Sequence, residues 1–197
     1  EKSRNLMTVR IAQHIGMETV ASYAKRFNLH PNLPLMPSMA LGAGETTVLR
    51  LTSAYAMLVN GGRQIVPAFV ERIQDRHGRT IYTRDGRACE HCSEISWDGQ
   101  QPPALPDARD QVADPASAYQ VVSMLEGVVL RGTGRSVKEL GKPIGGKTGT
   151  TNNFNDAWFV GFTPDLAVGV YVGFDQPKTL GRRESGGKVA APIFREF

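Results

Sequence analysis

The sequence predicts an α/β fold of the α+β kind, in which an antiparallel sheet is flanked by helices. In the first two thirds of the chain, apolar residues recur at helical spacing. The last third instead holds three short runs of β-forming residues, at 147–151, 157–163 and 166–174. Because short turns separate these runs, we expect consecutive strands that pair as an antiparallel meander.

The composition is that of one globular domain. The chain has 197 residues, of which 41% are hydrophobic, enough for a buried core. The net charge is +4, but the 23 basic and 19 acidic residues are interspersed, which argues against a nucleic-acid partner. No apolar run reaches the roughly 18 residues that a membrane span requires. The first residues show neither an initiator Met nor a signal peptide, so we expect a fragment.

The first part of the chain is expected to be helical. Two short helices are predicted within 5–27, where Gly16 interrupts the apolar pattern. A Pro-rich loop follows, and then Thr46 or Thr47 caps a third helix. That helix ends at the glycine pair 61–62, because glycine readily adopts the conformation that closes a helix.

The middle of the chain alternates between regular and irregular segments. A hairpin is predicted at 69–82, around a glycine turn. The segment 84–114 is polar and Pro-rich, and its apolar residues follow neither the helical nor the strand spacing. We interpret it as a partly mobile excursion. Ser117 is expected to cap a helix that stops near the Gly-Thr-Gly at 132–134. A last helix is predicted over 190–197, with a proline in its first turn.

The motif with the clearest chemistry is Lys147-Thr148-Gly149-Thr150, on a predicted strand. Lysine supplies a positive charge and the two threonine hydroxyls donate hydrogen bonds, so together they can hold a carboxylate. Gly149 leaves room for a ligand to approach the backbone, which could pair with an extended peptide. Such a short motif also occurs by chance, and an exposed strand end is the alternative interpretation.

The surroundings of this motif carry a resemblance. Gly145-Gly146 precedes it, 151–153 reads Thr-Asn-Asn, and 156–164 reads Asp-Ala-Trp-Phe-Val-Gly-Phe-Thr-Pro. In these residues the chain resembles the penicillin-binding proteins, most closely the transpeptidase domain of the bifunctional class A enzymes. The resemblance extends over nearly the whole chain except 84–114.

This resemblance implies a β-lactamase/transpeptidase-like fold, of which the chain is one part. Residues 1–66 would be a helical portion and 67–116 the hairpin with the Pro-containing and Cys-containing excursion. Residues 117–197 would hold a helix, the K-T-G strand and the strands that follow. All three are expected to belong to one partial transpeptidase domain.

Ser3-Arg4-Asn5 matches the second motif of that family, S-x-N, at the start of the first helix. The resemblance implies that Ser3 relays protons and that Asn5 hydrogen-bonds the substrate. The alternative is that Ser3 only caps the helix. In the family the nucleophilic motif, S-x-x-K, lies upstream of S-x-N, so we expect this chain to lack it and to be inactive alone. Ser22-Tyr23-Ala24-Lys25 matches the pattern, but it follows S-x-N and is interpreted as ordinary helix surface.

By resemblance, the function is peptidoglycan D,D-transpeptidation through a serine acyl-enzyme. Lys147, Thr148 and Thr150 would bind the carboxylate of a D-Ala-D-Ala stem peptide. The backbone N–H of Thr150 would form half of the oxyanion hole, a contribution of about 3 kcal/mol in comparable sites. Expected partners are stem peptides, β-lactams and cell-wall synthesis proteins. No cofactor or metal is expected, and the location would be the periplasmic face of the inner membrane, with an anchor upstream of this chain.

Two other functions share these motifs. Serine β-lactamases and D,D-carboxypeptidases pass the acyl group to water instead of an amine, whereas a β-lactam sensor would keep the fold without turnover. Thr150 and the segment 152–156 resemble the transpeptidases, which favours that function.

The two cysteines form one cluster, Cys89-Glu90-His91-Cys92. A disulfide is expected in an oxidising periplasm, because zinc would need four ligands and only His91 is near. A thioredoxin-type role would need a βαβ context that this loop lacks. Disulfide and free thiols both stay open.

Overall fold

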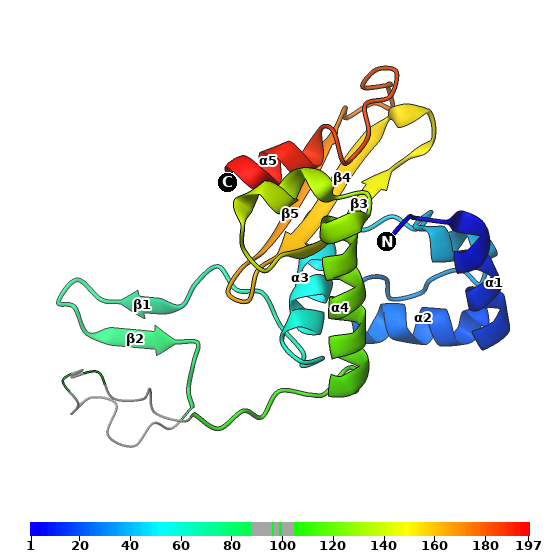
Figure 1. The fold of residues 1–197 in the computed structure, drawn as a ribbon. Helices are drawn as coiled ribbons and strands as arrows, with labels where there is room; N and C mark the ends of the chain where they lie inside the picture. Colours follow the sequence, from blue (N-terminus) through cyan, green and yellow to red (C-terminus); the bar gives the residue numbers. More distant parts are fainter. Residues whose placement is uncertain (88–95, 97–98, 100–104) are drawn as a thin grey trace. The chain divides into compact units, whose positions relative to one another are not determined.

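The computed structural model of the chain describes residues 1–87, 96, 99 and 105–197 (Figure 1). It divides into two compact units, one made of 1–65 with 111–197 and the other of 66–110. The predictions for Cys89 and Cys92 lie outside the described residues, and so does part of the predicted excursion.

The predicted helices of the first part are confirmed: α1 (Asn5–Ile15), α2 (Met17–Arg26) and α3 (Val48–Val59). Gly16 separates α1 from α2 with a φ of 85°, a positive value that glycine adopts without steric cost. A short 3-10 helix, η1 (Pro37–Leu41), lies in the Pro-rich loop. Thr47 caps α3, because its hydroxyl accepts the N–H of Arg50 at 3.2 Å.

The next helix, α4 (Pro115–Arg131), begins differently from the prediction. Ser117 is not its cap; that prediction is wrong. The carboxylate of Asp114 accepts the backbone N–H of Ser117 at 2.8 Å. Pro115 explains the difference, since proline favours the first helical position and leaves the residue before it as the cap. The short η2 (Arg135–Leu140) follows α4.

The last third forms the predicted antiparallel meander, in the order β3 (Gly145–Thr150), β4 (Asp156–Phe162) and β5 (Ala167–Gly173). The register pairs Lys147 with Val160 and Thr148 with Phe159. One short 3-10 helix, η3 (Asn152–Phe154), lies between β3 and β4. Among the described residues no strand pairs with the other side of β3, so β3 is an edge strand.

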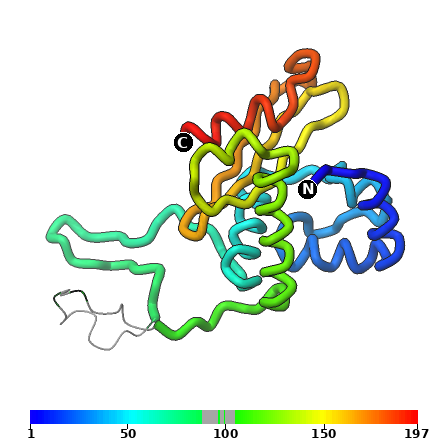
Figure 2. The backbone as a smooth tube through the Cα atoms, viewed as in Figure 1, coloured from blue at the N-terminus to red at the C-terminus, as the bar shows by residue number. Residues whose placement is uncertain are grey.

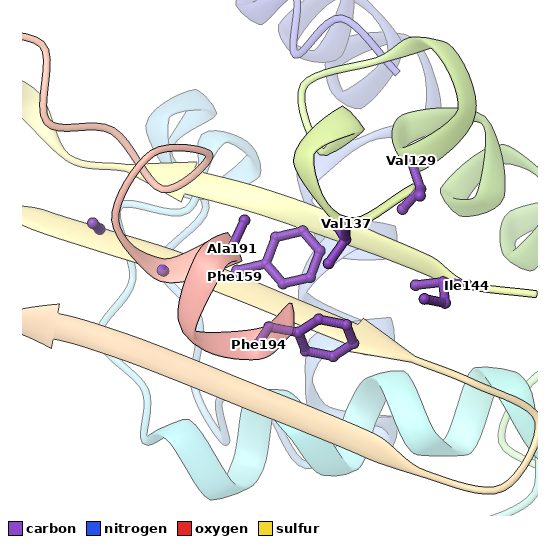
Figure 3. Close-up of a cluster of buried hydrophobic side chains, with 8 residues drawn as sticks. Val129, Val137, Ile144, Phe159, Ala191 and Phe194 are labelled. Carbon is purple, nitrogen blue, oxygen red and sulfur yellow. The ribbon is translucent and has the colours of Figure 1, made fainter. Parts of the chain in front are cut away.

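Helices cover both faces of this sheet (Figure 1). On one face α5 (Ala190–Glu196) packs on a fully buried Phe159, whose ring lies edge-on to Phe194 with centroids 4.9 Å apart. Figure 3 shows this core, which also contains Val129, Val137, Ile144 and Ala191. On the other face α3 approaches so closely that Thr52 occupies the space where a side chain of Gly169 would lie. The sheet is therefore a middle layer, as predicted.

The unit of residues 66–110 contains the predicted hairpin, which is confirmed as β1 (Arg72–Gln74) paired with β2 (Thr80–Thr83). Its turn contains Gly78 at a φ of 79°. Neither this unit nor the larger one contains, in its described part, a helix with the length and apolar character that a membrane span requires.

Candidate active site

Two predicted motifs meet in the structure. Lys147, on β3, donates a hydrogen bond from its Nζ to the Oγ of Ser3 at 2.7 Å. Its second bond goes to the backbone carbonyl of Thr148 at 2.8 Å. The residue that caps α1 is Arg4, without a side-chain hydrogen bond, so the alternative role of Ser3 as a helix cap is wrong. Ser3 instead precedes that cap residue, and its hydroxyl accepts the hydrogen bond of the lysine of K-T-G.

The side chains of the K-T-G strand divide between the two faces of the sheet. Thr148 lies opposite Phe159, whose ring packs towards α5, so Thr148 and Thr150 share that face. Lys147 points to the other face, where α3 packs on the sheet. The edge of β3 therefore presents an ammonium on one side and two hydroxyls on the other.

The ammonium of Lys147 is partly withdrawn from water. Burial lowers its pKa from the ordinary value of 10.5, because desolvation disfavours the charged form. A partly desolvated cation attracts a carboxylate more strongly than an exposed one does. Because the Oγ of Ser3 accepts from Lys147, its own hydrogen remains available to pass to another atom.

Thr148 has a partner that sequence reasoning missed. Its hydroxyl oxygen lies 2.6 Å from that of Thr133, in the segment that follows α4. Residues 132–134 are predicted only as a helix end, and a threonine between two glycines was the available signal. This contact fixes the rotamer of Thr148 at the edge of β3.

A second missed residue is Gly186, in the segment before α5. Its backbone N–H donates to the hydroxyl of Thr150 at 3.0 Å. A side chain at Gly186 would overlap the carbonyl oxygens of Gly149 and Trp158, so only glycine allows this approach. The hydroxyl of Thr150 is thereby oriented with its hydrogen still free to donate.

The remaining motif residues also lie at exposed positions. Asn5 is the first residue of α1, and within the described part of the chain its side chain makes no hydrogen bond. Ser22 and Lys25 are both exposed on α2, in agreement with an ordinary helix surface.

The chain also contains a second literal S-x-x-K match, at 185–188. It forms a turn in which the N–H of Lys188 bonds the carbonyl of Ser185 at 2.9 Å. The side chain of Lys188 is exposed, and the described residues show no bond from it to the Ser185 hydroxyl. Neither match therefore pairs a serine with an activating lysine.

Comparison with known proteins identifies the family. The model of the penicillin binding protein transpeptidase domain matches residues 1–197. The chain belongs to this family. Among the relatives of this transpeptidase-domain chain, penicillin-binding protein 1A of Rickettsia bellii is 50% identical over 199 residues, covering 100% of the chain and 25% of the relative. Penicillin-binding protein 1A of Neisseria gonorrhoeae is 40% identical over 197 residues, covering 99% of the chain and 23% of the relative.

A solved structure of a penicillin-binding protein has a similar fold. The crystal structure of penicillin-binding protein 1A from Haemophilus influenzae matches with a TM-score of 0.81 at 30% identity, covering 99% of this chain and 32% of that one. The resemblance and the fold class predicted from the sequence are thus confirmed. The chain spans about a quarter of the length of the curated relatives it matches.

Proposed function

We propose that this chain forms one wall of the active site of a peptidoglycan D,D-transpeptidase, which works through a serine acyl-enzyme and is inhibited by β-lactams. The observation that supports this most directly is the bond between Lys147 and Ser3. It brings together two family motifs that lie 144 positions apart in the sequence. Two accidental matches would have no reason to converge on one hydrogen bond.

In this proposal the hydroxyls of Thr148 and Thr150 hydrogen-bond the terminal carboxylate of a D-Ala-D-Ala stem peptide, and the positive charge of Lys147 attracts that carboxylate from the other face of β3. The open edge of β3 pairs with the extended peptide. The N–H of Thr151 bonds Asp156 in β4 at 3.1 Å, so the N–H of Thr150, one residue back, points to the open edge. That orientation suits the proposed half of an oxyanion hole.

Acylation then proceeds by attack of a serine oxygen on the carbonyl carbon between the two D-alanines. The serine passes its proton to the lysine of its S-x-x-K motif, the new C–O bond forms, the C–N bond breaks, and the leaving amine takes up a proton. We assign the delivery of that proton to Ser3, whose oxygen is held by Lys147, and we assign a substrate hydrogen bond to Asn5. The nucleophile is assigned to an S-x-x-K motif of the longer protein, because neither match within these residues has the required serine–lysine pair.

The substrate also determines the proposed location. Stem peptides are built into the wall outside the inner membrane, so we place the longer protein at the periplasmic face, where other cell-wall synthesis proteins are candidate partners. β-Lactams would bind as mimics of the stem peptide, with their carboxylate in the place proposed for the stem-peptide carboxylate.

Labelling with a fluorescent penicillin tests this function. The longer protein that carries this chain and the 197-residue chain alone are incubated with the reagent, and intact mass locates the adduct. We expect one adduct on the longer protein and none on the chain. An adduct on Ser22 or Ser185 would contradict the assignment of the nucleophile.

A second assay separates the transpeptidase from the hydrolases. The longer protein is given a D-Ala-D-Ala donor peptide with and without an amine acceptor, and the products are resolved by mass. A cross-linked product supports the transpeptidase. Release of D-alanine with water as the only acceptor supports a carboxypeptidase instead.

A further inference from the structure

The residues before Ser3 are attached to the last turn of α4. The carboxylate of Glu1 forms an ion pair with Arg131, with one hydrogen bond from Nε at 2.9 Å. The ammonium of Lys2 donates to the backbone carbonyl of Arg131 at 2.7 Å, and the carbonyl of Glu1 accepts the N–H of Thr133 at 3.3 Å. Figure 2 shows the start of the chain beside this end of α4.

Two glycines leave room for Glu1 beside α4: Gly127 lies within the helix and Gly132 is its C-cap. A side chain at Gly127 would lie 2.7 Å from the Cδ of Glu1. A side chain at Gly132 would lie 2.5 Å from the carbonyl oxygen of Glu1. Since real Cβ atoms essentially never come within 3.0 Å of a non-bonded atom, a side chain at either position would displace Glu1, and at Gly132 it would also meet the backbone of Val128.

The same turn also reaches the K-T-G strand. Thr133 bonds the backbone of Glu1 on one side, and its hydroxyl contacts that of Thr148 on the other. Ser3 itself has a φ of 54°, a conformation that a non-glycine residue keeps only when its surroundings impose it. Ser3 lies between the tethers of Glu1 and Lys2 on one side and its own bond to Lys147 on the other.

We propose that Arg131 is a positioning residue of the acyl-transfer site: through Glu1 it holds Ser3 on Lys147, while the adjacent Thr133 holds Thr148. The inference rests on the proposed function, because it concerns the same site. Arg131 itself touches neither Ser3 nor Lys147 through a side-chain bond, so its effect passes through the backbone of residues 1–3.

A purely stabilising role fits the ion pair less well. The side chains of Arg131 and Glu1 are 63% and 29% exposed, and ion pairs with such exposure contribute little to stability. Their loss should therefore leave the fold unchanged. A small displacement of a group that transfers a proton, in contrast, slows the reaction severely.

The test uses the longer protein with four variants. Arg131→Ala removes the guanidinium and Arg131→Lys keeps the charge. Gly127→Ala keeps the Arg131 side chain, and its methyl group displaces the carboxylate of Glu1 while coming 3.0 Å from Nη2 of Arg131. Arg135→Ala is the matched control, an exposed arginine of η2 in the same segment. The acylation rate constant and the dissociation constant of the first complex are measured with a fluorescent penicillin, together with the melting temperature.

For Arg131→Ala and Gly127→Ala we expect an acylation rate constant lower by about tenfold, at a melting temperature close to that of the parent. Arg131→Lys should recover part of the rate, and Arg135→Ala should match the parent. A parent-like rate for Arg131→Ala would overturn the inference while leaving the proposed function intact. An equal loss in Arg135→Ala would overturn it too, because the effect would then not depend on Glu1.

A crystal structure of Arg131→Ala provides a readout independent of acylation. If the parent protein is not acylated, the proposed function fails, and the geometry of this variant still decides the inference. A retained bond between Ser3 and Lys147 would overturn it. Separation of the two residues, with the rest of α4 unchanged, would support it.

Discussion

Replacing Gly186 by alanine tests how closely the end of the K-T-G strand is packed. Gly186 donates its N–H to the hydroxyl of Thr150, and its carbonyl accepts the N–H groups of Ala190 and Ala191 at the start of α5. An added methyl group would overlap the carbonyl oxygens of Gly149 and Trp158, both within 3.0 Å. Because these are backbone atoms of the sheet, the segment that carries Gly186 must move instead.

The size of the effect follows from that movement. Restoring ordinary contact requires the segment to rise by roughly 1 Å, and such overpacking costs about 1–3 kcal/mol. Loss of the bond to Thr150 adds about 1 kcal/mol. A total of about 2–4 kcal/mol corresponds to a melting temperature lower by roughly 4–16 °C for a domain of this size. Because the Thr150 hydroxyl loses its orientation, acylation should also slow by about tenfold or more.

The assay is thermal unfolding of the longer protein, followed by labelling with a fluorescent penicillin at a temperature where the variant is folded. Gly86→Ala is the matched control, because the same methyl group at Gly86 would meet open space. A Gly186→Ala variant that melts and reacts like the parent would refute the close packing of this segment on β3.

Two further predictions concern the charge at the site and the core. Burial lowers the pKa of Lys147, so its ammonium is present below that pKa and is lost as the pH rises through it. The acylation rate is therefore expected to fall on the alkaline side with a midpoint below 10.5, and Lys147→Arg should remove this limb from the pH–rate profile, because arginine does not deprotonate there. Phe159→Ala should destabilise the domain by about 3–5 kcal/mol, because the fully buried ring leaves a cavity beside Phe194. Phe69→Ala, at a position that is 89% exposed, should leave the denaturation midpoint unchanged, which makes it the control in the same measurement.

The elements of the fold could be predicted because their signals are local. The apolar period of α1 to α3 and the β-forming runs of the sheet are each contained in a few neighbouring residues. The start of α4 was missed because Asp114 and Ser117 both satisfy the rules for a cap. Pro115 separates the two, since it favours the first helical position and so selects Asp114.

The site could be predicted only in part, because its contacts join distant segments. Residue types indicated Ser3 and Lys147, but nothing local reports that they form a bond. Thr133 and Gly186 escaped notice for the same reason: each acts on β3 from another element, and each looks locally like an ordinary helix end or turn. Such residues are identified by packing and not by spacing.

The exposed edge of β3 could also pair with chains other than the substrate. The edge of β3 that no strand of the described residues covers offers its row of donors and acceptors to any extended chain, including a second copy of this protein. Two features limit that hazard: the strand is only six residues long, and a lysine stands in its middle. The ammonium of Lys147 is therefore expected to disfavour pairing with a second copy, in addition to its role in the proposed function. A variant without this charge is therefore expected to associate more readily through β3.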